Sequence, residues 1–152
     1  QNLSDGRFKS NVREDVPGLD FITRLRPVTY TLMAEKVDEH LGIKQRMDTL
    51  PEAETRAWYY NRLKEVSAER LTGFIAQEVE QVAMEMGYEF DGVHHPLNER
   101  DHYTLGYASF VVPLVKAVQE QQVRIEAQER TIAAQQHAIE RLENRMNELM
   151  NR

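Results

Sequence analysis

The sequence of 152 residues has no cysteine, which excludes disulfide bonds, thiolate nucleophiles and cysteine-based zinc sites. It has no run of about 18 apolar residues and no apolar leader, so we expect neither a membrane span nor a signal peptide. Acidic residues outnumber basic ones by 25 to 19, and the lysines and arginines form no cluster. A nucleic-acid partner is therefore not expected, since phosphate binding needs a basic stripe.

The histidines His94, His95 and His102 are the residues that most resemble a metal site. Adjacent histidines point in opposite directions on a strand, and no aspartate or glutamate lies at a spacing that would complete a ligand set. We expect these histidines to be structural or at the surface, and we expect no metal and no other cofactor.

The first two thirds of the chain predict a small head of mixed structure. A short helix is expected over 19–25, ended by Pro27, followed by a strand over 28–32. Residues 35–70 are highly charged and are predicted to be helix and loop, as an insertion with an aromatic group at 58–60. That group either anchors the insertion or forms a contact surface.

The second half of the head has a clearer pattern. Residues 71–76 indicate a strand that runs into a helix over 77–86, closed by Gly87. Short strands are expected to flank Asp91 and Gly92 and to cover residues 103–107.

The C-terminal part of the sequence has a different pattern from the head, with a repeat of seven residues from Val111 onward. The a positions are Val111, Val118, Ile125, Ile132, Ile139 and Met146, and the d positions are Leu114, Gln121, Gln128, Gln135, Leu142 and Leu149. A helix of about 40 residues would be roughly 60 Å long, too long for this head to cover. The apolar stripe is therefore expected to pack against copies of itself, rather than fold back as a surface helix.

The three central d positions are glutamines, whose buried amides need hydrogen-bond partners. They lower stability compared with leucine, but a ring of them can determine the register of the helices. Because these layers are polar, the usual rule that isoleucine at a and leucine at d favours dimers does not apply. The repeat therefore predicts a coiled coil without choosing between two and three strands.

Four motifs in order carry a family resemblance. They are SDGRFKSNV at 4–12, LRPVTY at 25–30, GFIAQEV at 73–79 and YTLGY at 103–107, and a coiled coil follows them. This set resembles the peptidase S74 family, the C-terminal intramolecular chaperone domains of phage endosialidases, tail fibres and tailspikes. The resemblance covers residues 4 to about 125, with 35–70 and the last heptads outside it.

The resemblance implies an α+β fold, mainly α, with a small mixed head and a long C-terminal helix in a homotrimeric coiled coil. It divides the chain into an upstream remnant (1–3), a chaperone head (4–110) and a trimerisation helix (111–152). Gln1 in place of methionine fits a fragment of a longer chain. Such a domain would guide folding of the upstream fibre in the host cytoplasm during virion assembly, and would be absent from the mature virion after release.

The resemblance also implies self-cleavage at the Leu3–Ser4 bond, with Ser4 as nucleophile and Lys9 as general base. A serine needs a base to take its proton, and lysine accepts one only when neutral, a form that burial favours. Five residues apart, the two face away from each other on a helix or strand, so they need a turn, and Asp5-Gly6 has turn chemistry. Lys9 of a neighbouring chain is the alternative.

The surrounding residues have weaker assignments. Asp5 either caps the turn or orients the dyad, Gly6 belongs to the turn, and Arg7 is expected to pair with a carboxylate. Gly73 is expected to allow close backbone approach, and Glu78 lies at a helix start or contacts the dyad.

Two other functions remain open at this point. A trimerisation module that stays attached to a fibre or adhesin would need no cleavage, and the presence of residues 1–3 ahead of the expected cut is consistent with it. The myelin regulatory factor, a membrane-tethered transcription factor, carries a similar domain. The absence of a membrane span after the head argues against that second alternative.

Overall fold

The computed structural model describes residues 3–151, and most of these residues are helical. The helices are α1 (Leu19–Arg24), α2 (Ala34–His40), α3 (Ile43–Asp48), α4 (Ala53–Ala68), α5 (Ala76–Glu85) and α6 (Val111–Met150), with the 3-10 turns η1 (Gly6–Phe8) and η2 (Tyr107–Phe110). The strands are β1 (Val28–Thr31), β2 (Arg70–Gly73), β3 (Val93–His94) and β4 (Thr104–Leu105). The predicted fold class, mainly α with a small mixed head and a long C-terminal helix, is confirmed.

The described residues form two compact units, one made of 3–23 with 110–151 and the other of 24–109. Gln1 and Asn2 of the expected upstream remnant, and Arg152 at the end of the expected coil, lie outside the described residues. No helix in the described part of the chain has the length and apolarity needed to cross a membrane.

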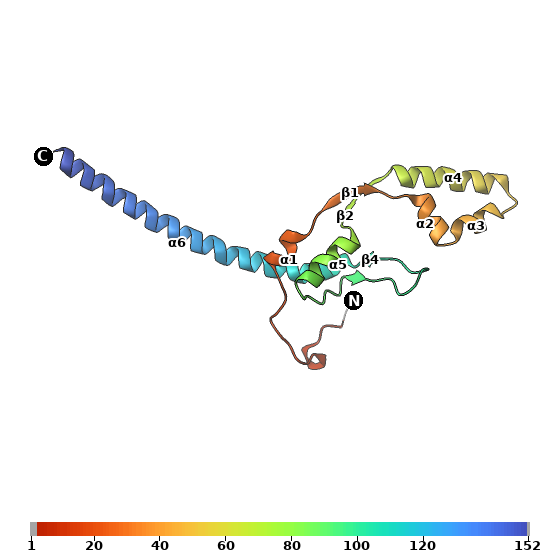
Figure 1. Ribbon diagram of the computed structural model, residues 1–152, viewed down its shortest axis with the longest axis horizontal. Coiled ribbons are helices and arrows are strands. Elements are labelled where there is room, and N and C mark those ends of the chain that lie inside the picture. The colour runs from red at the N-terminus through yellow and green to blue at the C-terminus, as the bar shows by residue number, and fades with distance from the viewer. Residues whose placement is uncertain (1–2, 152) are drawn as a thin grey trace. The chain divides into compact units, whose positions relative to one another are not determined.

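In the unit of residues 24–109, two strands far apart in the sequence join the charged insertion to the rest. β1 and β2 pair antiparallel, with Val28 opposite Gly73 and Thr31 opposite Arg70 (Figure 1). Helices α2, α3 and α4, joined by short loops, lie between these strands in the sequence, as the prediction of helix and loop for 35–70 has it. The insertion therefore begins and ends at a two-stranded ladder.

The aromatic group of α4 divides between core and surface. Tyr59 is 6% exposed and donates a hydrogen bond from its hydroxyl to Asp38 of α2 at 2.8 Å, and Tyr60 donates to Asp48 of α3. Trp58 is 66% exposed. Two of the three aromatic rings thus anchor α4 to α2 and α3, and the third is at the surface.

Helix α5 ends as the sequence indicates. Gly87 has a φ of 64°, in the left-handed region that favours glycine. Its N–H donates to Met84 at 3.1 Å and the N–H of Tyr88 donates to Ala83 at 2.9 Å, which is the hydrogen-bond pattern of a Schellman cap. Val79 and Ala83, one turn apart, are the buried face of this helix.

The short strands of this unit differ in part from expectation. β3 pairs antiparallel with β4, His94 opposite Thr104, so a strand does follow Gly92. No strand lies between α5 and Asp91 among the described residues, and Tyr107 begins the turn η2 instead of ending a strand. The backbone N–H of Phe74 donates to the hydroxyl of Tyr107.

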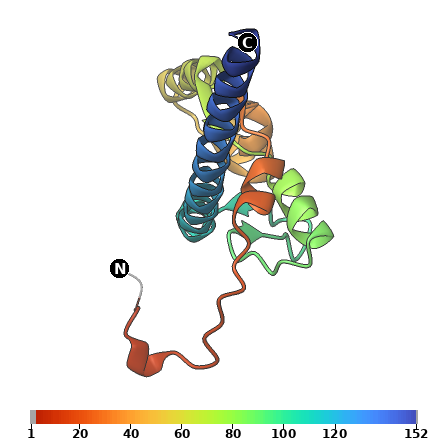
Figure 2. The same ribbon diagram turned by 90° about the vertical axis from the view of Figure 1, so that its left-hand side faces the viewer.

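In the other unit, α1 packs on the N-terminal part of α6 (Figure 2). The N–H of Leu19 donates to a carboxylate oxygen of Glu120 at 2.8 Å, so a side chain of α6 caps the start of α1. A Cβ on Gly18 would lie 2.8 Å from the backbone nitrogen of Ala117, so glycine is needed here. Phe21, Phe110, Pro113 and Ala117 are buried in this unit.

Beyond Glu120, α6 continues as an uninterrupted helix (Figure 1), and the side chains of its apolar stripe are exposed. Pro113 lies in its first turn, where a proline costs little. The exposed fractions along the stripe are 62% for Val118, 42% for Ile125, 53% for Ile132, 55% for Ile139, 62% for Leu142, 60% for Met146 and 66% for Leu149. The d-position glutamines Gln121, Gln128 and Gln135 are exposed on the same face.

Candidate functional site

The N-terminal motif folds into a single tight turn. Asp5 precedes η1 with extended backbone, and its carboxylate accepts a hydrogen bond from the N–H of Arg7 at 2.9 Å. The N–H of Phe8 donates to the carbonyl of Asp5 and that of Lys9 to the carbonyl of Gly6. Asp5 is therefore the N-cap of the turn, as one of its two expected roles requires.

This turn brings Ser4 and Lys9 together. The Nζ of Lys9 lies 3.0 Å from the Oγ of Ser4, within hydrogen-bond distance. An extended chain would place residues five positions apart on opposite sides, so the contact depends on the reversal at Gly6–Phe8. A hydroxyl and an amine in contact are the geometry that a serine nucleophile and its base require.

Arg7 lies beside the dyad and pairs with a carboxylate, as expected. Its guanidinium binds both oxygens of Asp5, at 2.6 Å for the closest pair, and lies 5.7 Å from the centre of the Phe8 ring. The hydrogen bonds from Arg7 lower the pKa of the Asp5 carboxyl, and the same pairing raises the pKa of Arg7. Arg7 thereby stabilises the capped turn through Asp5.

The turn is exposed in the single chain. Ser4 and Lys9 are both at the surface, and the neighbouring apolar side chains Leu3 and Phe8 are 78% and 69% exposed. Water therefore reaches the dyad from most sides. An enzyme that uses a lysine base excludes water from that lysine. In the single chain, Ser4 and Lys9 have the mutual contact of a catalytic dyad, but no protein surface shields them from water.

Gly73 and Glu78 have structural partners in the unit of residues 24–109. A side chain at Gly73 would overlap the hydroxyl of Tyr107, which confirms the close approach expected there. The carboxylate of Glu78, in the first turn of α5, forms an ion pair with Arg26 that raises the pKa of this arginine. The role of Glu78 beside the dyad stays a prediction.

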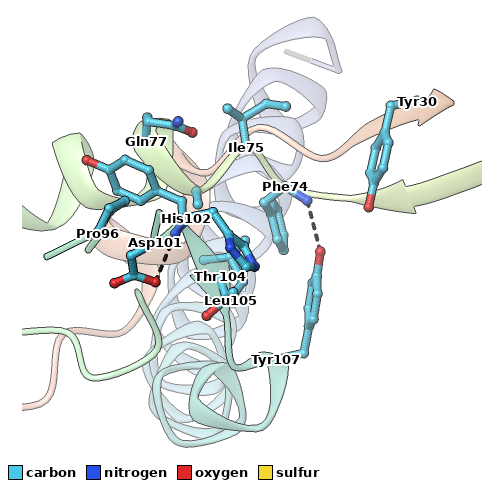
Figure 3. Close-up of a pocket in the computed structure, with 12 residues that line it drawn as sticks. Tyr30, Phe74, Ile75, Gln77, Pro96, Asp101, His102, Thr104, Leu105 and Tyr107 are labelled. Carbon is cyan, nitrogen blue, oxygen red and sulfur yellow. Dashed lines mark hydrogen bonds between the residues drawn. The ribbon is translucent and has the colours of Figure 1, made fainter. Parts of the chain in front are cut away.

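A hollow that sequence reasoning missed lies in the same unit (Figure 3). Its volume is about 580 Å³, and its walls come from β1, the start of α5 and the segment 96–107. Phe74 and Tyr107 are stacked in it with ring centres 6.2 Å apart, and the backbone N–H of Phe74 donates to the Tyr107 hydroxyl. The motifs GFIAQEV and YTLGY, which lie far apart in the sequence, thus meet at this hollow.

The histidines near the hollow bind carboxylates. His94 contacts Asp101 at 2.8 Å, and His95 contacts Glu80 at 2.8 Å. The backbone hydrogen bond from Leu97, together with hydrogen bonds from the His94 side chain and the His102 backbone, lowers the pKa of Asp101 to about 2. No group of three potential metal ligands is found in the part of the chain that the structure describes.

Comparison with known proteins gives one positive result. Residues 4–44 match the model of the Peptidase_S74 family, described as chaperone of endosialidase. The match begins at Ser4 and covers the turn, α1, β1 and α2, and it confirms the resemblance for this segment. Neither the curated proteins nor the solved structures gave a significant match. The match supports a chaperone role.

Proposed function

We propose that this chain is an intramolecular chaperone that assembles as a homotrimer through α6, guides folding of an upstream phage tail fibre or tailspike, and then releases itself by cleavage at Leu3–Ser4. The observation that carries the proposal is that the segment matching the chaperone family begins at Ser4, whose hydroxyl lies 3.0 Å from the Lys9 amine. The family match and the side-chain contact point to the same residues.

The proposed reaction uses groups of the turn alone. Neutral Lys9 takes the proton of the Ser4 hydroxyl, and the oxygen attacks the carbonyl carbon of Leu3. The carbon–nitrogen bond of the peptide breaks, the nitrogen of Ser4 receives the proton, and Leu3 is left joined to Ser4 as an ester. Water then hydrolyses this ester, which gives a carboxylate at Leu3 and a free amino group at Ser4.

Both dyad residues come from one chain in this proposal. The 3.0 Å contact lies within a single turn capped by Asp5, so a neighbouring chain does not have to supply the lysine. The neighbouring chains instead shield the dyad from water, because Ser4 and Lys9 are exposed in the single chain. Burial in the assembly favours the neutral amine, and cleavage would then follow correct assembly.

The trimer is supported by the stripe on α6. Seven side chains from Val118 to Leu149 are each at least 42% exposed, although they lie on one face of one helix. Contact with sibling helices removes this apolar surface from water, at about 25 cal/mol per Å². Three strands are proposed on the family match, since the heptad pattern does not choose the number.

The test is a longer chain that includes the upstream fibre, expressed as wild type, Ser4→Ala and Lys9→Ala. We expect wild type to split at Leu3–Ser4 and both variants to remain full length while still sedimenting as trimers. Arg13→Ala, an exposed basic residue beyond the turn, is the matched control and should be cleaved like wild type. Processing of Ser4→Ala at the wild-type rate would contradict the assigned nucleophile.

Mixed trimers test whether the dyad acts within one chain. Co-expression of Ser4→Ala with Lys9→Ala leaves no chain with both residues, so we expect no cleavage product. A product from such mixed trimers would show that Lys9 reaches the serine of its neighbour.

The second candidate is a trimerisation module that is never cleaved. The exposure of the dyad favours it, because the contact in the single chain lacks cover. Mass spectrometry of the mature parent protein separates the two. Retention of residues 4–152 on the fibre would support the second candidate and contradict the first.

A further inference from the structure

Arg124 and Glu129 are charged residues of α6 that have no charged partner within the chain. Both are exposed, and no side-chain hydrogen bond or salt bridge joins either of them to another of the described residues. In the seven-residue repeat, Arg124 occupies the g position directly before Ile125, and Glu129 occupies the e position directly after Gln128. Because the g and e positions border the apolar stripe, both side chains lie at the edges of the surface that the proposed assembly buries.

The neighbours of Glu129 within α6 leave its charge uncompensated. On a helix, residues three and four positions apart face one another. For Glu129 these neighbours include no cation, and one of them carries the same charge. They are Ile125, Glu126, Ile132 and Ala133. A cation that pairs with Glu129 therefore has to come from outside this helix.

Arg124 has one acidic neighbour at this spacing, and that neighbour is already bonded. It is Glu120, four residues earlier, whose carboxylate accepts a hydrogen bond from the N–H of Leu19 at 2.8 Å. The other neighbours of Arg124 at this spacing are uncharged, namely Gln121, Ala127 and Gln128. The guanidinium of Arg124 is therefore available to a carboxylate of another chain.

The order of charges along the two edges of the stripe favours copies that run in the same direction. The charged g positions of α6 are both arginine, Arg124 and Arg145, and the charged e positions are both glutamate, Glu129 and Glu143. Parallel helices place the g position of one chain beside the e position of its neighbour, so opposite charges can meet. Antiparallel helices place g beside g and e beside e, so only like charges would meet.

In a parallel assembly this rule gives one complete ion pair at each interface. A g residue meets the e residue five positions further along the neighbouring chain. Five positions beyond Arg124 is Glu129, whereas five positions beyond Arg145 is Met150. Residues five apart lie on different sides of one helix, so this pair forms between chains and not within one. A guanidinium can bind both oxygens of a carboxylate, which adds direction to the contact.

We propose that the partner of α6 is a second copy of the chain in the same direction, with Arg124 of each chain paired to Glu129 of the next. The inference rests on the proposed assembly, and it adds the direction of the chains and the residues that select it. Parallel helices place the N-terminal ends of all copies of α6 at one end of the assembly. Antiparallel helices would separate these ends by roughly 60 Å, which would not bring the upstream chains together for folding.

The test reverses each charge in the full chain and measures association by sedimentation equilibrium over a range of concentrations. In Arg124→Glu and in Glu129→Arg, like charges meet at every interface, so we expect the concentration of half-dissociation to rise by about tenfold or more. The double variant Arg124→Glu/Glu129→Arg restores opposite charges and should associate nearly as strongly as wild type. A double variant that associates no better than the single variants would overturn the pair.

The matched controls are the same changes at the same heptad positions, where the neighbouring chain offers no partner. Arg145→Glu faces Met150 and Glu143→Arg faces Ala138, so both variants should associate like wild type. Each control changes the net charge by as much as the variant that it matches. Equal weakening in controls and variants would assign the effect to net charge and would overturn the pair.

The direction of the chains has a separate readout, because the wild-type chain contains no cysteine. Val118→Cys and Leu149→Cys each place a single thiol in the stripe, near one of its two ends. Parallel chains in register bring identical residues together, so mild oxidation should link copies of the same variant in both cases. Association without a disulfide link in either variant would overturn the parallel direction.

The wild-type chain keeps failure of this inference apart from failure of the proposed function. If wild-type chains associate but the double variant is not rescued, the ion pair is overturned and the chaperone proposal stands. A wild-type chain that stays a monomer at every concentration would overturn both.

Discussion

Helices α4 and α6 are the two longest of the described chain, and they differ in how their apolar side chains are covered. On α4, Tyr59 is 6% exposed because α2 covers it and Asp38 binds its hydroxyl. On α6, Ile125 and Ile132 are 42% and 53% exposed. The first helix packs against its own chain, whereas we propose that the second packs against further copies of the chain.

The largest effect is expected from a charge in the stripe of α6. Ile125→Asp places a carboxylate at an a position, where assembly would bury it without a partner, so we expect loss of the trimer. Val123→Asp is the matched control, because Val123 is 64% exposed and lies outside the a and d positions. Sedimentation velocity should show a monomer for the first variant and a trimer for the second. The same oligomeric state in both variants would contradict the proposal that the a and d positions of α6 form the interface between chains.

The next effect concerns the one part of α6 that its own chain covers. In Gly18→Ala the added Cβ would lie 2.8 Å from the backbone nitrogen of Ala117, so α1 must shift away from α6. Overpacking of this kind costs about 1–3 kcal/mol, and chemical denaturation should show a loss of that size. Gly6→Ala, where no atom lies within 4 Å of the added group, should leave the stability unchanged. Equal stability of the two variants would mean that the contact at Gly18 is not needed.

A smaller effect on stability is expected in the insertion formed by α2, α3 and α4. Tyr59→Phe removes the hydrogen bond to Asp38 and should reduce the free energy of unfolding by about 1 kcal/mol. Trp58→Phe, at an exposed site, should change it by less than about 0.5 kcal/mol. Urea denaturation followed by circular dichroism measures both, and a larger loss in Trp58→Phe would reverse the division between core and surface.

The same tyrosine predicts a dependence on alkaline pH. Burial, together with Asp38, raises the pKa of Tyr59 to about 12, above the value near 10 of an unfolded tyrosine. The stabilisation is therefore complete below pH 10 and is lost as the pH rises toward 12. Tyr59→Phe should lose less stability than wild type between pH 10 and pH 12, as measured by the free energy of unfolding against pH. The same pH dependence in the variant and in wild type would contradict the assignment of this loss to Tyr59.

The smallest effect is expected in the loop that ends at β4. The pKa of Asp101 is lowered to about 2, so its contribution is present above about pH 4 and is lost as the pH falls toward 2. In Asp101→Asn the N–H of Leu97 should exchange with solvent faster at neutral pH. Asp91→Asn is the control, and no change of exchange at Leu97 in either variant would argue against the role of Asp101.

Local patterns predicted most elements of the fold. Pro27 ends the helix before it, Gly87 closes α5 through its left-handed conformation, and the seven-residue repeat indicates α6. These features act through neighbours in the sequence or one turn away. Tyr107 was predicted to be in a strand, but it begins a turn, and its hydroxyl accepts a hydrogen bond from the N–H of Phe74, 33 residues earlier.

The candidate site was predictable in its residues but not in its surroundings. The motif at 4–12 predicts the dyad and the turn, and the structure brings Ser4 and Lys9 into contact. Their catalytic roles stay predictions. The hollow beside Phe74 had no signal in the sequence, because its walls come from three separate segments that no local pattern relates.

Features that depend on residues close together in the sequence could be predicted from the sequence alone. They are the cap of Asp5, the end of the helix before Pro27 and the apolar stripe from Val118 to Leu149. Each depends on backbone geometry or helical periodicity, which short stretches of chain carry. The three-dimensional arrangement alone supplied the Glu120 cap on α1, the stacking of Phe74 on Tyr107 and the covering of Tyr59 by α2. These contacts join residues 21 to 101 positions apart, and such pairings arise only when the chain packs against itself.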